Sequence, residues 1–186
     1  TRPGADLEEL QSDGRPLTQG SLRIGEGGMI EVRGDMVFLG YCEPGGGYRR
    51  PETSDGWFRT GDLGYFDDQG LLHVSGRADA MFISGGENIH PEEIEAALCA
   101  LPGITRAVVA PVPHDDYGAV PCAFLECPED VLPSLDLLRE QVRAALPGYK
   151  HPHYCFPLPE ASKARVKPDR KWLQEHALWL LAMTEG

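Results

Sequence analysis

The sequence lacks a long apolar run, which limits the classes of protein it can encode. Among its 186 residues the longest apolar candidate, Ala177 to Met183, falls far short of the roughly 20 residues that a membrane-spanning helix needs. Hydrophobic residues make up 41% of the chain and charged residues 25%, as in ordinary globular proteins. We therefore expect a soluble globular chain without a membrane span.

Basic residues are scarce. Lysine and arginine number 17 against 29 aspartates and glutamates, which gives a net charge of -12. A surface of this charge repels the phosphates of nucleic acids and of anionic lipids. The composition therefore argues against a nucleic acid as a partner.

Paired cysteines are missing as well. The number of cysteines is odd and no two form a Cys-x-x-Cys motif, so the sequence indicates neither a disulfide framework nor a zinc site. The five positions are Cys42, Cys99, Cys122, Cys127 and Cys155. Unpaired thiols predict a reducing, cytoplasmic location.

Several ready-made catalytic motifs are absent. The sequence contains no Gly-Lys-Ser/Thr phosphate loop, no Gly-x-Ser-x-Gly elbow and no His-Glu-x-x-His helix. His151 and His153 alternate on an extended segment, so their rings would point to opposite faces, and we expect an exposed loop rather than a metal site. The chain begins at Thr1 without an initiating Met, which predicts a fragment or a processed chain.

The first half of the chain alternates short apolar runs with glycine-rich turns. This pattern predicts a meander of strands, with a loop from Glu43 to Asp55 and a hairpin turn from Asp67 to Gly70. The expected strands are Leu22 to Ile24, Met29 to Arg33, Met36 to Leu39, Trp57 to Arg59, Gly64 to Phe66 and Leu71 to Ser75.

Beyond Arg77 the pattern changes to strands and helices in alternation, and we expect a domain boundary near Asp79. Pro91 suits the first position of a helix that ends at Pro102, and Ser134 suits the cap of another. Strands are expected at 104–112 and 121–125, and a final helix at 171–181. The predicted fold class is α+β: a short-stranded β subdomain followed by a small α/β domain with a central sheet and flanking helices.

Three sequence blocks carry a family resemblance. They are Trp57 to Gly64 (WFRTGDLG), Ser75 to Asp79 (SGRAD) and Ile83 to Glu95 (ISGGENIHPEEIE). In these blocks, which keep the family's order and spacing, the chain resembles the adenylate-forming superfamily of acyl-CoA synthetases, luciferases and peptide-synthetase adenylation domains. The resemblance implies that residues 1–78 are the incomplete closing β-rich subdomain of the AMP-binding N-terminal domain, and that residues 79–186 are its mobile C-terminal domain.

The resemblance assigns Thr60, Asp62 and Arg77 to nucleotide binding. A carboxylate such as Asp62 can accept two adjacent hydrogen bonds, which matches the vicinal hydroxyls of a ribose. The guanidinium of Arg77 offers fixed charge and forked donors to the ribose or phosphate. Without the surrounding blocks, Asp62 would equally suit a turn and Arg77 a surface ion pair.

Two more assignments concern motion and the acceptor. Asp79 matches the hinge about which family members swing their C-terminal domain. Ser84, Gly85, Gly86 and Glu87 match the loop that lines the pantetheine tunnel of CoA ligases, where residues without a Cβ let a ligand lie against the backbone. The alternative is that the two glycines only form a tight turn. Because peptide-synthetase domains usually carry Lys-Ile-Arg-Gly in this loop, CoA is the preferred acceptor.

Lys167 is the candidate catalytic lysine. The spacing of Lys167, Arg170 and Leu173 matches the last family block, and a lysine there can bridge the substrate carboxylate and the α-phosphate. Val166 replaces the usual glycine, a departure that also resembles some o-succinylbenzoate-CoA ligases. Lys163 is a nearby competitor, and each lysine of this basic tail could simply be exposed.

The resemblance implies an acid-CoA ligase that turns a carboxylic acid into an acyl-AMP and then into an acyl-CoA. Its cofactors would be ATP, giving AMP, with Mg²⁺, and CoA; no metal ligand is assigned to this chain. The phosphate loop and most of the acyl pocket would belong to the missing N-terminal domain, so we expect little independent adenylation. A non-catalytic module and a peptide-synthetase-type adenylation fragment remain alternatives.

Overall fold

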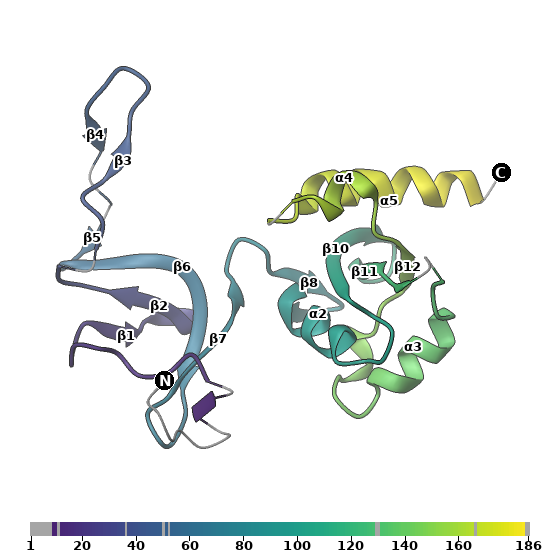
Figure 1. Cartoon of the computed structure of the whole chain (residues 1–186), viewed down its shortest axis with the longest axis horizontal. Helices are drawn as coiled ribbons and strands as arrows, with labels where there is room; N and C mark the ends of the chain where they lie inside the picture. The colour runs from purple at the N-terminus through teal and green to yellow at the C-terminus, as the bar shows by residue number, and fades with distance from the viewer. Residues whose placement is uncertain are drawn as a thin grey trace. The chain divides into compact units, whose positions relative to one another are not determined.

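The computed structural model describes residues 9–10, 12–35, 37–49, 51, 53–128, 131–165 and 167–184 (Figure 1). The chain divides into two compact units, Thr1–Asp79 and Ala80–Gly186. Each unit builds its own sheets. Among the described residues, no helix has both the length and the apolar character needed to cross a membrane.

The first unit is built on a five-stranded sheet. Strand β6 is its centre, because β2, β5 and β7 all pair with it antiparallel, and β1 pairs with β2. The strands are β1 (Leu22–Ile24), β2 (Met29–Val32), β5 (Thr53–Ser54), β6 (Trp57–Phe66) and β7 (Leu72–Arg77), with a separate hairpin of β3 (Tyr41–Cys42) and β4 (Tyr48–Arg49) and a 3₁₀ turn η1 (Glu26–Gly28).

Three predictions about the first unit were wrong. The expected separate strands at 57–59 and 64–66 are one strand, whose register shifts between Leu63 and Gly64 at a β-bulge. The expected loop from 43 to 55 contains β4 and β5. Met36 lies outside the described residues, and 37–39 form no strand. The turn at Asp67 is confirmed, because its side chain accepts hydrogen bonds from the amides of Gln69 and Leu71.

The second unit has a central three-stranded sheet. Strand β10 (Arg106–His114) pairs antiparallel with β11 (Gly118–Glu126), which pairs parallel with β12 (Tyr154–Pro157). The remaining elements are the hairpin of β8 (Phe82–Ser84) and β9 (Glu87–Ile89), the helices α2 (Pro91–Cys99), α3 (Leu135–Val142), α4 (Glu160–Lys163) and α5 (Arg170–Thr184), and the 3₁₀ turn η3 (Gly148–Lys150).

Helices cover both faces of this sheet (Figure 1). Alternate residues of β10 point to opposite faces, so Val109 joins a buried cluster with α2 and α3, whereas Val108 joins a second cluster with α5. Leu98 on α2 and Leu173 on α5 are fully buried, and each such side chain contributes roughly 1.5–3 kcal/mol to stability. The predicted α+β class, with a central sheet and flanking helices, is confirmed.

Local signals explain where the helices begin. Pro91 occupies the first turn of α2, where its missing amide hydrogen is not needed. Ser134 caps α3 by accepting a hydrogen bond from the amide of Leu137. The predicted final helix exists but extends from Arg170 to Thr184. Strands β8, β9 and β12 are too short to show a sequence pattern, and none of them was predicted.

Candidate functional site

The antiparallel pairing of β6 and β7 brings predicted nucleotide residues together. Asp62 lies opposite Arg77 in the register, and Arg77 Nη1 donates to Asp62 Oδ1 at 3.2 Å and to the carbonyl oxygen of Thr60 at 3.2 Å. Gly61, between Thr60 and Asp62 in the chain, has a φ of +82°, and a Cβ there would lie 2.9 Å from Arg77 Nη2. The glycine therefore allows the arginine to lie across the strand.

The side chain of Thr60 has local partners. Its hydroxyl donates to the carbonyl oxygen of Ile30 at 2.9 Å and accepts from the amide of Asp62 at 3.0 Å. These bonds fix the backbone on which Asp62 stands. Any contribution of Thr60 to nucleotide binding stays a prediction, and the contacts give it a supporting position behind the carboxylate.

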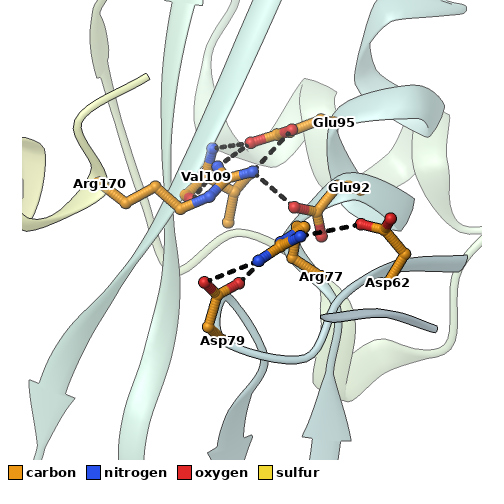
Figure 2. A network of polar contacts seen from close by, with 7 residues as sticks. All are labelled: Asp62, Arg77, Asp79, Glu92, Glu95, Val109 and Arg170. Carbon is orange, nitrogen blue, oxygen red and sulfur yellow. Dashed lines mark hydrogen bonds and ion pairs between the residues drawn. The ribbon is translucent and has the colours of Figure 1, made fainter. Parts of the chain in front are cut away.

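Asp79 binds the other edge of the Arg77 guanidinium (Figure 2). Arg77 Nε and Nη2 donate to the two carboxylate oxygens at 3.0 and 3.1 Å, a bidentate geometry. These hydrogen bonds raise the pKa of Arg77 and lower that of Asp79. Arg77 thus joins the predicted ribose acid, Asp62, to the predicted hinge residue.

The predicted CoA loop is the turn of the β8–β9 hairpin. Gly85 and Gly86 have φ values of +57° and +89°, as a two-residue type I′ turn requires, so the turn reading of these glycines is correct as far as it goes. The turn also borders a pocket of about 310 Å³. Its lining comprises Ser84, Gly85, Glu87, Tyr117, Gly148, Tyr149 and His153.

The far side of this pocket was not predicted. Tyr117 lies in the turn between β10 and β11, and its carbonyl oxygen accepts a hydrogen bond from the amide of Gly85 at 3.0 Å. The ring of His153 lies 5.9 Å from that of Tyr117 and 5.5 Å from that of His114, centre to centre. Burial, then the charges of Arg139 and His114, lower the pKa of His153.

The segment of His151 and His153 is a loop, as expected, but the expectation that it is exposed was wrong. Both side chains are half-buried, and His151 Nε2 contacts the carbonyl oxygen of Leu146 at 3.0 Å. The alternation argument missed this because β11 and α3 pack against the segment from elsewhere in the sequence. No group of three metal-ligating residues occurs in the described part of the chain.

Lys167 lies in the segment between α4 and α5 and is exposed. Its competitor Lys163 pairs with Glu160 at 2.6 Å within α4, where its side chain is 21% exposed. Lys171 is exposed on the first turn of α5. Of the two lysines between the start of α4 and the start of α5, Lys167 is therefore the one that faces solvent.

Comparison with known proteins agrees with the family resemblance of the three sequence blocks. Residues 93–167 match the AMP-binding enzyme C-terminal domain. The chain is 38% identical over 176 residues to a 2-succinylbenzoate–CoA ligase of Bacillus licheniformis, an alignment that covers 88% of this chain and 36% of the relative. It is 36% identical over 177 residues to a sulfoacetate–CoA ligase of Cupriavidus necator, covering 94% of this chain and 33% of that one.

Residues 93–167 thus form an AMP-binding enzyme C-terminal domain, and the chain as a whole is similar to the matching part of these CoA ligases. Its fold matches the o-succinylbenzoate-CoA synthetase of Bacillus subtilis, solved with an acyl-adenylate intermediate, with a TM-score of 0.75 and 32% identity. That match covers 90% of this chain and 36% of the other. The chain therefore spans about a third of the length of the family members it resembles, and these relatives are CoA ligases.

The candidate residues lie on both units. Asp62 and Arg77 stand on adjacent strands of the first unit, whereas the Gly85 turn and Lys167 belong to the second. Within the second unit the Gly85 turn is followed by β9 and then by α2, and Lys167 lies three residues before α5 begins. The family match at 93–167 begins within α2, after the turn, and ends at Lys167.

Proposed function

We propose that this chain is the C-terminal part of an ATP-dependent, AMP-forming acid-CoA ligase. The relatives named above support the reaction class. The observation that carries the proposal is the Gly85 turn, which borders a pocket of about 310 Å³ on the same unit as the solvent-facing Lys167. One unit thus offers a place for a thiol acceptor and a mobile cation for adenylation.

In the first half-reaction the substrate carboxylate attacks the α-phosphate of ATP, and pyrophosphate leaves. Asp62 would accept the ribose hydroxyls, and Arg77 would donate to the ribose or phosphate. The ammonium of Lys167 would lie between the two anions as they approach and would stabilise the charge that develops on the phosphate oxygens. The described residues offer no three-ligand metal cluster, so Mg²⁺ would enter with ATP.

In the second half-reaction the thiolate of CoA attacks the acyl carbon of the adenylate, and AMP leaves. The pantetheine arm would lie along the turn at Gly86, which has no Cβ to obstruct it. A Cβ on Gly86 would meet nothing within 4 Å, so the space above that residue is open. Asp79 would be the hinge that exchanges the lysine for the turn between half-reactions.

The acid is proposed by chemical class and by similarity. The chemistry requires a carboxylic acid. The first acid to test is 2-succinylbenzoate, because the relative from Bacillus licheniformis is a 2-succinylbenzoate–CoA ligase. The missing N-terminal domain of the same enzyme, which would hold the acyl pocket, is the expected partner. A cytoplasmic location remains a prediction from the cysteines.

The test uses this chain joined to the N-terminal portion of the Bacillus licheniformis relative. Lys167→Ala should lower acyl-AMP formation, measured by ATP–pyrophosphate exchange, by about 100-fold or more. Thioester formation from supplied acyl-AMP and CoA should change little. Lys171→Ala serves as the matched control and should leave both steps intact. Equal loss of both half-reactions in Lys167→Ala would contradict the assigned role.

A further inference from the structure

The segment that carries Lys167 is held at its C-terminal end by Arg170 (Figure 2). This arginine begins α5, three residues after the lysine. Its Nη1 donates to the carbonyl oxygen of Val109 at 2.9 Å and to Glu95, and its Nη2 donates to Glu92 at 2.8 Å. The side chain is only 19% exposed, so these contacts are largely shielded from water.

Glu95 is the principal partner in this cluster. Its Oε1 accepts from both Arg170 Nη1 and the amide of Val109, the latter at 2.7 Å, and its Oε2 accepts from Nη2 at 3.3 Å. Glu92 uses one oxygen, and its Oε2 has no hydrogen-bond partner among the described residues. Glu95 therefore ties the arginine to both α2 and β10.

The N-terminal end of the same segment is held by a second arginine. Arg106 Nη1 donates to the carbonyl oxygens of Ser162 and Lys163 at 3.3 and 3.1 Å, and its Nη2 donates to that of Arg165 at 2.8 Å. These carbonyls end α4, where no further helical turn supplies donors. Arg106 begins β10, the strand that also contains Val109. Both ends of the segment are thus fixed to one strand of the central sheet.

We propose that Arg106 and Arg170 are positioning residues that hold the segment of Lys167 for acyl-AMP formation. The inference rests on the proposed function, because it concerns the lysine assigned to that step. Lys167 itself stands on an exposed stretch with a flexible four-carbon stem. Fixing both ends of the stretch limits the volume that the ammonium can sample without burying it.

The contacts that hold the Lys167 segment differ from those that hold the loop beside the pocket of the Gly85 turn. Lys150 beside that pocket contacts Glu93 of α2 at 2.5 Å, whereas Arg170 contacts Glu92 and Glu95 of the same helix. Neighbouring acids on one helical turn therefore hold the two loops independently. A displacement of about 1 Å in a reacting group can lower a rate by about 100-fold, so loss of one anchor should affect one step selectively.

The experiment measures both half-reactions in the joined enzyme described above. Arg170→Met keeps an unbranched apolar stem and removes the guanidinium with its donors. We expect the kcat of acyl-AMP formation to fall about 10- to 100-fold with little change in the KM for ATP, since the lysine is retained but displaced. Thioester formation from supplied acyl-AMP should stay within about 2-fold. Arg170→Lys should restore part of the loss.

Four further variants guard against simple misfolding. Glu95→Gln should lower acyl-AMP formation more than Glu92→Gln, because Glu95 makes more of the contacts. Arg106→Met should act in the same direction as Arg170→Met. Arg143→Met removes an exposed arginine of the same unit away from this segment, one that pairs with Glu140 at 2.8 Å, and should leave both steps unchanged.

The outcomes separate this inference from the proposed function. If Lys167→Ala abolishes acyl-AMP formation while Arg170→Met and Glu95→Gln leave it unchanged, the positioning role is wrong and the function stands. If Arg106→Met and Arg170→Met lower both half-reactions equally, the two arginines have only a structural role and the inference is also wrong. If Lys167→Ala has no effect, the proposed function itself fails.

Discussion

The two units each hold an arginine between two carboxylates, in opposite surroundings (Figure 2). Arg77 of the first unit is 46% exposed, and its partner Asp79 is 73% exposed. Arg170 of the second unit is 19% exposed, and its partner Glu95 is 17% exposed. Arg77 can therefore exchange its partners for water or for a ligand at little cost, whereas loss of Glu95 would leave the shielded charge of Arg170 with Glu92 as its remaining carboxylate partner.

This difference suits two kinds of work. An exposed guanidinium that already binds carboxylates is ready to bind the oxygens of a nucleotide, provided that Asp62 or Asp79 releases it. A shielded guanidinium that also binds a strand carbonyl holds chain segments together. Burial raises the cost of charging Arg170, yet Glu95 and Glu92 outweigh that cost and its pKa is raised.

The largest effect should come from Glu95→Ala. It leaves the partly buried Arg170 with a weaker set of partners and removes an acceptor from the amide of Val109, so we expect a loss of about 2–4 kcal/mol in the free energy of unfolding of the second unit. The matched variant Asp62→Ala in the exposed cluster should cost less than about 1 kcal/mol. Urea denaturation of both variants measures the difference, and equal losses would remove the contrast.

A smaller loss is expected from Gly64→Ala in the first unit. A Cβ at Gly64 would lie 2.5 Å from the carbonyl oxygen of His73 and 2.9 Å from Ile30 Cδ1, so the strands around the bulge would have to separate. We expect a cost of about 1–3 kcal/mol by urea denaturation. Gly45→Ala is the control, because a Cβ there meets nothing within 4 Å. Equal stability of the two variants would show that the geometry at the bulge does not hold the first unit.

Much of this architecture follows from local sequence signals. The helix starts at Pro91 and Ser134 and the turn at Asp67 were predicted correctly. A helix start or a tight turn depends on neighbours within a few residues, so the local sequence indicates it. The family blocks located Asp62 and Arg77, and the register of β6 and β7 places the two side by side.

The long-range parts could not be predicted in this way. Arg106 contacts carbonyls 56 to 59 residues away, and Arg170 contacts Glu95 from 75 residues away. Nothing near either arginine in the sequence indicates these partners. His153 was misjudged for the same reason, since Tyr117 and His114 reach it from another turn. Arg170 was seen only as part of the spacing that identified Lys167.

A third prediction compares the two units by pH. The pKa of His153 is lowered, so the native second unit disfavours its charged form and should lose stability as the pH falls below about 6.5. Arg139 and His114 lie close to its ring and add to this effect. The pKa of Asp67 in the first unit is lowered by its hydrogen bond with His73. Ionised Asp67 therefore stabilises the first unit at neutral pH, and this contribution is lost only below about pH 4.

Unfolding followed in each unit from pH 8 to 3 checks these windows. His153→Gln should flatten the change between about pH 6.5 and 5, and Asp67→Asn should flatten the change below about pH 4. His151→Gln is the control for the first of these, since it changes a neighbouring half-buried histidine outside the pocket lining. A pH profile that His153→Gln leaves unaltered would mean that another group causes the loss near neutral pH.

The smallest change in stability should come from Asp79→Asn. The side chain of Asp79 is 73% exposed, so removing its charge should alter the free energy of unfolding by less than about 1 kcal/mol, and added salt should reduce the difference further because exposed pairs are screened. The variant still frees Arg77 from one of its two carboxylates. If Asp79 is the hinge, the joined enzyme should therefore change its rate of passing from adenylate to thioester while its stability stays constant. An Asp79→Asn enzyme with both half-reactions and their sequence unaltered would leave Asp79 as an ordinary surface acid and would place the hinge elsewhere.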